Sequence, residues 1–218
     1  VGAKVRKLID DHVISLGIDP KIPPIQLTDA EFDRQLGRAA NDRAKASEME
    51  HAIRSHIRKH VDEDPVLYRK LSERLNEILR TLGQQWNEVT QELQKIIDDL
   101  RTGMASNADT PSDLPPHCAP FLRTLLDVVS TGHSPNPAEL VRLKDVTVEL
   151  VDILVDELKG NADLWKPHRR ADQENLNGLL FDHLMRLRPP LVDTDTAGVL
   201  ADRLLEQARA SHATLVRV

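Results

Sequence analysis

The sequence is poor in aromatic residues and has a single cysteine. Phe, Tyr and Trp together make up 3% of its 218 residues, and they are scattered along the chain. Proteins that bind single-stranded nucleic acid stack the bases on clustered aromatic rings, so this class is disfavoured. The lone Cys118 excludes an internal disulfide framework and favours a reducing compartment, so we expect a cytoplasmic protein.

The sequence also lacks a basic excess and any long hydrophobic run. Its formal net charge is -6, whereas a dedicated, sequence-independent DNA binder usually carries an excess of Lys and Arg. No apolar run approaches the roughly 20 residues of a membrane span, and no signal peptide opens the chain. We therefore expect no membrane association. The start at Val1-Gly2, which runs straight into a helical pattern, suggests a piece of a longer protein.

The sequence is rich in helical periodicity. Apolar residues recur with a period of about 3.6 in almost every ordered segment, and almost no segment alternates as a strand would. With 40% hydrophobic residues, a chain of this length buries a substantial core. We therefore predict an all-α protein, a multi-helix bundle of about eight or nine helices in two packed subdomains.

Start and stop signals place several of these helices. A first helix is expected over Val5–Leu16, and a capping box at Thr28–Glu31 opens a second. Another is expected from about Asp42 to His60. Asp64-Pro65 begins the next helix, because Asp accepts hydrogen bonds at an N-cap and Pro tolerates the first helical position. Gly83 is placed to end that helix.

The clearest break in the helical pattern lies at residues 102–118. This stretch contains three prolines, a glycine and several Ser, Asn and Asp residues, with little to bury. We therefore expect an N-terminal helical subdomain over residues 1–101, a linker loop over 102–118 and a C-terminal helical subdomain over 119–218.

His56 and His60 are candidate metal ligands, because two imidazoles at i and i+4 on a helix can reach one zinc ion. A third ligand would have to come from His51, Asp62 or elsewhere. The adjacent Arg58-Lys59 pair would repel a cation. A polar face turned to solvent or to a partner is the favoured interpretation, and we expect neither metal nor cofactor in this chain.

Two other patterns carry weak signals for chemistry. Asp62–Asp64 with His60 could belong to a helical metal-dependent hydrolase, but Val61 breaks the adjacent His-Asp order, and negative charge before Pro65 suits a helix N-terminus. Lys166–Arg170 is a short basic cluster that could contact phosphate, although surface charge is the default interpretation. No Walker-type loop, metal-binding Cys pair or Ser/His/Asp arrangement is present, so we predict no catalytic residue.

One stretch, Ala44–Leu75, has denser and more patterned polar residues than an amphipathic helix needs around its stripe of Met49, Ile53 and Ile57. It resembles the C-terminal region of type I restriction enzyme R subunits, and the residues that carry the resemblance are Ala46–Arg54, His56, Ile57, His60, Glu63–Pro65, Tyr68 and Leu71–Leu75. Similarity extends to Lys4–Pro24, Leu164-Trp165 and Leu200–His212, whereas residues 102–118 match nothing in the family.

The resemblance implies a large ATP-driven subunit that translocates and cuts DNA, part of a type I site-specific deoxyribonuclease. Such subunits carry a nuclease domain at the N-terminus, two RecA-like motor domains, and a helical C-terminal domain implicated in docking onto the modification and specificity subunits. This chain would hold only the helical domain. The catalytic residues, ATP and Mg would then belong to the rest of the subunit, and the chain alone is expected to be non-catalytic.

We therefore expect an assembly domain whose partners are the modification and specificity subunits and the motor domains of the same chain. A mixed-charge surface suits a protein partner better than a DNA groove. The predicted interaction surface comprises Glu48, Glu50, His51, Arg54, His56, Arg58 and His60. A DNA contact that guides duplex toward the motor is the alternative, and a helical metal-dependent hydrolase is a more distant one.

Overall fold

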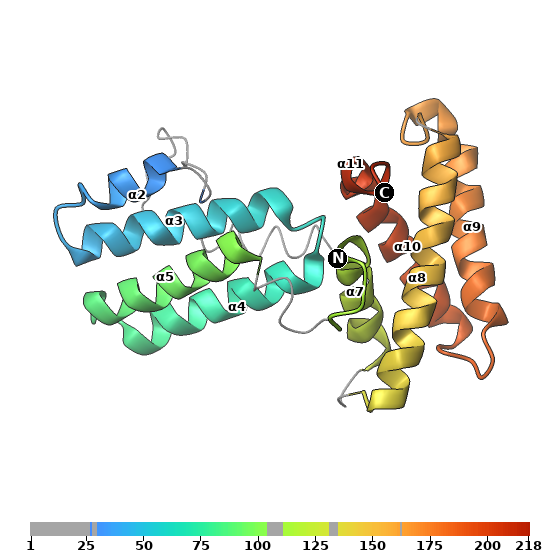
Figure 1. Cartoon of the computed structure of the whole chain (residues 1–218), viewed down its shortest axis with the longest axis horizontal. Helices are drawn as coiled ribbons and strands as arrows, with labels where there is room; N and C mark the ends of the chain where they lie inside the picture. The colour runs from blue at the N-terminus through green and yellow to red at the C-terminus, as the bar shows by residue number, and fades with distance from the viewer. Residues whose placement is uncertain (1–26, 28–29, 104–110, 131–134, 162) are drawn as a thin grey trace. The chain divides into compact units, whose positions relative to one another are not determined.

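The structure, a computed structural model, describes residues 27, 30–103, 111–130, 135–161 and 163–218 (Figure 1). In these residues it contains nine α-helices, two short 3₁₀ helices and no strand. The prediction of an all-α bundle with eight or nine helices is thereby confirmed. None of the described helices combines the length and apolar character of a transmembrane span. The helix expected over Val5–Leu16 and residue Thr28 of the expected capping box lie outside the described residues.

The chain divides into two compact units. Unit 1 consists of Val1–Val61 and Leu67–Ala108, and unit 2 consists of Asp62–Val66 and Asp109–Val218. The short segment Asp62–Val66 therefore belongs to unit 2, although it was expected within an N-terminal subdomain over residues 1–101. The reason is a set of buried polar contacts, described below, that this segment makes with the helices of unit 2.

The described helices of unit 1 are α2 (Ala30–Leu36), α3 (Asp42–His60), α4 (Pro65–Leu82), whose first two residues belong to unit 2, and α5 (Trp86–Thr102). Helix α3 has the bounds that its sequence predicts, and it begins where the side chain of Asn41 accepts a hydrogen bond from the Ala44 amide at 2.9 Å. It packs against α2 and α5. Gly83 follows α4 with a φ of 54°, a left-handed conformation that glycine adopts without strain, so its predicted helix-ending role is confirmed.

The core of unit 1 fixes the rotation of α3. Met49, Ile53 and Ile57 are fully buried, as their i, i+4, i+8 spacing predicts. They meet apolar side chains of α4 and α5, among them Leu75 and Leu93. Burying side chains of this size contributes about 1.5–3 kcal/mol each. This stripe therefore decides which polar residues of α3 can face outward.

The described helices of unit 2 are α7 (Ala119–Val129), α8 (Pro137–Gly160), α9 (Arg170–Arg186), α10 (Thr194–Ala210) and α11 (His212–Leu215), with the 3₁₀ helices η2 (Pro116–Cys118) and η3 (Pro167–Arg169). Helix α7 packs against α8 and α10, and α9 packs against the same two helices. The fully buried core side chains come from all of these α-helices and include Phe121, Leu125, Leu150, Leu180, Leu204 and Leu215.

Part of the range predicted as a linker belongs to the unit 2 core. Within residues 102–118, the structure describes 102, 103 and 111–118. Leu114 and Cys118 are buried, and η2 leads directly into α7. The structure therefore differs from the predicted linker at its C-terminal end, because the prolines there begin a 3₁₀ helix instead of extending a loop. Burial, with a smaller contribution from the Asp152 carboxylate, raises the pKa of the Cys118 thiol to about 11.

Candidate functional site

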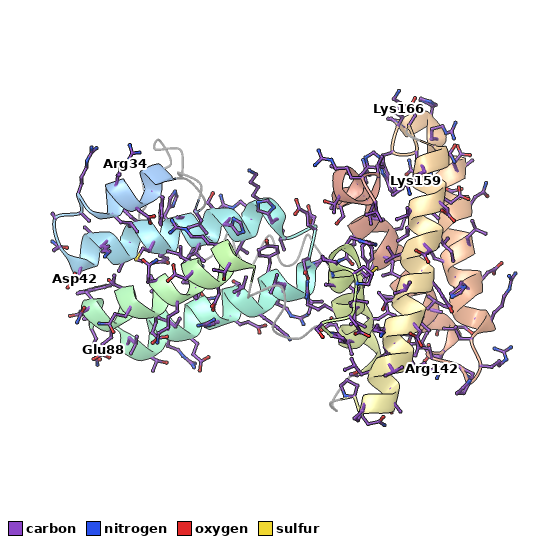
Figure 2. All side chains as sticks on the ribbon, in the orientation of Figure 1. Arg34, Asp42, Glu88, Arg142, Lys159 and Lys166 are labelled. Carbon is purple, nitrogen blue, oxygen red and sulfur yellow. The ribbon has the colours of Figure 1, made fainter. Side chains whose placement is uncertain are left out.

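The seven residues of the predicted interaction surface all lie on α3, but they do not share one face. Figure 2 shows charged side chains such as Asp42 and Glu88 projecting outward from unit 1. On α3, Glu48 and Arg58 are exposed in the same way, whereas His51 is partly covered. The remaining four residues lie in two contacts within unit 1, and each of these contacts has its own physical cause.

Glu50 and Arg54 point into unit 1. Arg54 is 4% exposed and Glu50 is 8% exposed. The Arg54 Nε donates to Glu50 Oε1 at 2.9 Å, and its Nη2 donates to Oδ1 of Asn76 on α4 at 3.0 Å. Buried charges persist when they are paired and hydrogen-bonded. These two residues therefore correct the predicted surface, because they form an internal ion pair within α3, and Arg54 also ties α3 to α4 through Asn76.

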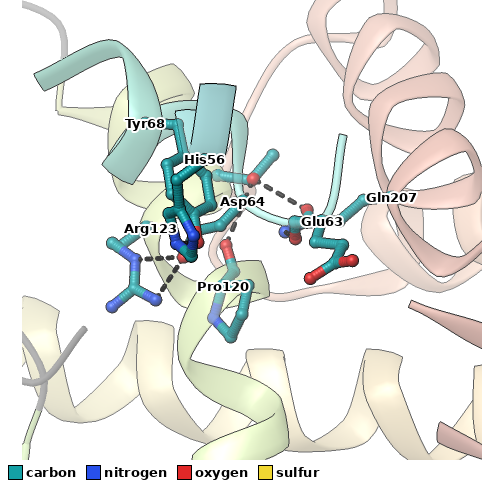
Figure 3. Close-up of polar contacts among 8 residues, drawn as sticks. His56, Glu63, Asp64, Tyr68, Pro120, Arg123 and Gln207 are labelled. Atoms are coloured by element: carbon teal, nitrogen blue, oxygen red, sulfur yellow. Dashed lines mark hydrogen bonds and ion pairs between the residues drawn. The ribbon is translucent and has the colours of Figure 1, made fainter. Parts of the chain in front are cut away.

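His56 and His60 pack with Tyr68 of α4 in a half-buried aromatic cluster. The ring centroids are 4.6 Å apart for the two histidines, 5.7 Å for His56 and Tyr68, and 6.2 Å for His60 and Tyr68. The Tyr68 hydroxyl lies 3.4 Å from His56 Nε2 (Figure 3). The two histidines thus contribute to the packing of unit 1. Among the described residues, no group of three or more His, Cys, Asp or Glu side chains is placed to hold a metal ion.

Partial burial, together with the nearby His60 and Lys59, lowers the pKa of His56 to about 4. His56 is therefore neutral at pH 7. An imidazole whose pKa is lowered in the folded state takes up a proton more readily in the unfolded chain, where the pKa is near 6.5. Its contribution to stability is fully present above about pH 6.5 and is lost as the pH falls toward the folded value of about 4.

We expect a His56→Gln variant to lose less stability on acidification than the unchanged chain. The difference between about pH 7.5 and about pH 4.5 should be on the order of 1 kcal/mol, since solvent screens a half-buried ring. Urea denaturation at the two pH values measures it. Identical pH dependence in the His56 variant and the unchanged chain would contradict the neutral, buried state of this ring.

The outward face of α3 comprises Glu48, His51, Ser55, Arg58 and Lys59, and we call it the α3 face. Its members recur at intervals of three and four residues, which places them on one side of a helix. The carboxylate lies in the N-terminal half and the two cations lie in the last turns. Cations near a helix C-terminus are favourable because they meet the negative end of the helix dipole. The face therefore presents both signs of charge in a fixed order.

A second polar cluster lies within unit 2, around the Glu63-Asp64 part of the resemblance (Figure 3). The Arg123 Nε donates to Asp64 Oδ2 at 2.9 Å, and Arg123 Nη2 contacts the same oxygen. The two side chains are 5% and 6% exposed. Gln207 of α10 donates its Nε2 to the carbonyl oxygen of Glu63 at 3.1 Å. Thr124 Oγ1 lies 2.9 Å from Gln207 Oε1.

Sequence reasoning did not find Arg123, Thr124 or Gln207. It assigned Asp64 to the start of α4, and α4 does begin at Pro65. The only signal for the rest was the Arg123-Thr124 pair, which interrupts the apolar run of α7. A charged residue in such a position indicates a buried partner without identifying it.

The basic cluster Lys166–Arg170 is largely balanced by local carboxylates. Lys166 pairs with Asp163 at 2.7 Å and Arg170 pairs with Glu174 at 2.9 Å. Arg169 pairs with Asp172 at 2.7 Å. Lys166 lies at the outer surface of unit 2 (Figure 2). Little of this positive charge is uncompensated, so the cluster gives weak support for a phosphate contact.

Each of these polar clusters thus lies within one unit, and the one around Asp64 joins residues far apart in the sequence. Comparisons with protein-family models, with curated proteins and with solved structures found no significant match. Support for a function therefore comes from the pattern of Ala44–Leu75 and from the placement of its side chains.

Proposed function

We propose that this chain is the C-terminal helical assembly domain of a type I restriction enzyme R subunit. In this role it docks a cytoplasmic, ATP-dependent subunit that translocates and cleaves DNA onto the modification and specificity subunits. The catalytic residues and the sites for ATP and Mg belong to the rest of the subunit, whose motor domains are the other partners. The observation that carries the proposal is the mixed-charge α3 face in the stretch that resembles the family.

The α3 face has the composition of a surface that registers a protein partner. Glu48 and the Arg58-Lys59 pair lie about three turns apart on the same side of α3, so opposite charges stand at its two ends. Complementary charge on a partner would fix both its direction and its position along the helix, and a wrong register would bring like charges together. A groove that tracks a phosphate backbone would instead need a single sign of charge.

The core behind the α3 face holds it in one conformation. Met49, Ile53 and Ile57 anchor the opposite side of the helix, and the Arg54 side chain links it to Asn76 of α4. A surface that is rigid before binding loses little conformational entropy when the partner arrives. The buried Arg54 thus helps to hold α3 in place, and this fixes the position of the exposed α3 face.

Reversing the charge at Arg58 or at Lys59 is expected to weaken assembly with the modification and specificity subunits about tenfold or more, because a like-charge contact costs several kcal/mol. Both side chains are exposed, so the free energy of unfolding should change by only about 0.5 kcal/mol. Pull-down of the chain by the modification and specificity subunits measures assembly, and thermal melts measure stability.

The matched control is Lys159→Glu, since Lys159 is an exposed lysine in the last turn of α8, as Lys59 is in the last turn of α3 (Figure 2). This control should assemble normally. Normal assembly by both the Arg58 and Lys59 variants would rule out the α3 face as the docking surface. A complete lack of association between the unchanged chain and these subunits would remove the proposed function itself.

The alternative function is a DNA contact. One observation favours it, namely that two cations, Arg58 and Lys59, lie next to each other at the C-terminal end of the α3 face. It requires that the chain bind duplex DNA and that the affinity fall steeply as salt rises. Measurable duplex binding at low salt that is lost in the Arg58→Glu and Lys59→Glu variants would support this alternative. Its absence at low salt would remove it.

A further inference from the structure

We infer that unit 2 contains a binding site for an acidic turn, formed by Arg123 and Thr124 of α7 and Gln207 of α10, and that the Asp62–Val66 turn of this same chain occupies it. The inference goes beyond the proposed function and does not depend on it. According to this inference, the residues Glu63-Asp64-Pro65 stabilise the fold of unit 2.

The charged part of this turn site is the ion pair of Asp64 and Arg123. Both residues are 4% exposed, so the guanidinium and the carboxylate have lost most of their contact with water and interact with each other instead. The Arg123 Nε–Asp64 Oδ2 distance is 2.9 Å, and a second guanidinium nitrogen contacts the same oxygen. Removing one partner of a buried pair leaves a desolvated charge with less compensation, which is far costlier than losing a surface pair.

The second part of the turn site recognises the main chain. Gln207 lies on the buried side of α10, next to Leu204 and Ala208, and is only 2% exposed. Its Nε2 donates to the Glu63 carbonyl oxygen at 3.1 Å, while its Oε1 accepts from Thr124 Oγ1 at 2.9 Å. A buried amide is tolerated when its donors and acceptors are satisfied. The Glu63 carbonyl oxygen therefore gives the Gln207 amide a hydrogen-bond partner, so a polar residue is tolerated at an otherwise apolar position of α10.

The chain contributes to unit 2 in two separate stretches. The chain leaves unit 1 after Val61, contributes Asp62–Val66 to unit 2 and returns to unit 1 at Leu67. It enters unit 2 for the second time at Asp109. A cut between Gly103 and Pro111 would therefore leave the turn on one fragment and Arg123 and Gln207 on the other. The contacts of Asp64 with Arg123 and of Glu63 with Gln207 would then join the two fragments noncovalently.

The test uses the full chain with a specific protease sequence placed between Gly103 and Pro111. After cleavage, the two fragments of the otherwise unchanged chain are expected to co-elute in size-exclusion chromatography at micromolar concentration. In the Asp64→Ala variant, the dissociation constant between the fragments should rise about a hundredfold or more, as expected for the loss of one partner of a buried ion pair.

Glu63→Ala is the matched control, because it removes an exposed side chain and keeps the carbonyl oxygen that Gln207 binds. Its fragments should remain associated like those of the unchanged chain. The double variant Asp64→Leu with Arg123→Met should hold together better than Asp64→Ala, since apolar residues can replace a buried ion pair but cannot compensate a lone buried charge.

Amide hydrogen exchange on the uncut chain provides a second readout. The amides of α7 and α10 should exchange faster in Asp64→Ala, whereas those of α5 in unit 1 should not change. Loss of unit 2 structure in that variant would support the inference in the same way. Fragments of the unchanged chain that separate as readily as those of Asp64→Ala, or unchanged exchange in α7 and α10, would overturn it.

Discussion

Replacing Arg54 by Glu is expected to destabilise unit 1 by about 3–5 kcal/mol, the range observed when a buried ion pair loses one partner. The new carboxylate would face Glu50 within the core, where the guanidinium now donates at 2.9 Å. It would also remove the donor to Asn76 Oδ1, which lies 3.0 Å from Arg54 Nη2. Both losses occur in a low dielectric, so water cannot restore them. Urea denaturation followed by circular dichroism measures the change.

Arg58→Glu is the control for this prediction, because it makes the same substitution one helical turn away at an exposed position. It should change stability by about 0.5 kcal/mol. The exchange Glu50→Arg with Arg54→Glu should recover part of the lost stability, since opposite charges meet again. Equal stability of the Arg54 and Arg58 variants would show that Arg54 is not internal. The contrast also explains why assembly is better tested at Arg58 than at Arg54, where unfolding would mimic lost binding.

Replacing Phe121 by Ala is expected to destabilise unit 2 by about 3–5 kcal/mol. Phe121 is 1% exposed in α7 and belongs to the same core cluster as Leu125 and Leu150. The substitution removes an aromatic ring and leaves a cavity that the close-packed helices can fill only in part. A lower urea midpoint at an unchanged denaturant slope would report this loss as a change in stability.

Leu179→Ala separates this packing effect from a general effect of removing apolar side chains. Leu179 lies on α9 of the same unit but is 46% exposed. Its truncation should therefore cost less than about 1 kcal/mol, because little apolar area leaves the core. If the Phe121 and Leu179 variants were equally stable, α7 would not be the core helix that the structure shows.

Local signals were enough to place α3 and its buried stripe. Asp42 and His60 bound the helix as predicted, because the apolar period and the polar flanking residues act within a few positions of each other. Met49, Ile53 and Ile57 are buried for the same reason. The helical class of the whole chain follows from many such segments, each of which indicates the same period.

The inward position of Arg54 could not be predicted from these local signals. Residues 50 and 54 stand at the edge of the apolar stripe, where a charged side chain can turn either way. In the structure, Arg54 donates to Asn76, which lies 22 positions away on another helix. The unit 2 cluster depends on still longer separations, 59 positions for Asp64 and Arg123 and 144 for Glu63 and Gln207. A periodic pattern carries no information about partners at such distances.

The composition of residues 102–118 predicted a break in the helical pattern, but it did not predict that the C-terminal end of this stretch is buried in the core of unit 2. Proline suggested a linker, yet Pro115 and Pro116 introduce η2, which carries Cys118 into the core of unit 2. Proline limits the backbone to a few conformations, and whether the next residue meets solvent or a core depends on the helices around it. Here α7 and α8 provide that core.

Because Cys118 is buried, its reaction with thiol reagents can report on the opening of unit 2. It is the only cysteine in the sequence, it is 1% exposed, and burial raises the pKa of its thiol to about 11. Thiol reagents attack the thiolate, so alkylation at neutral pH must await an opening that brings solvent to this sulfur. When closing outpaces labelling, the labelling rate gives the free energy of that opening under native conditions. Mass spectrometry of one alkylated site can therefore follow unit 2 separately from unit 1, without a probe being introduced.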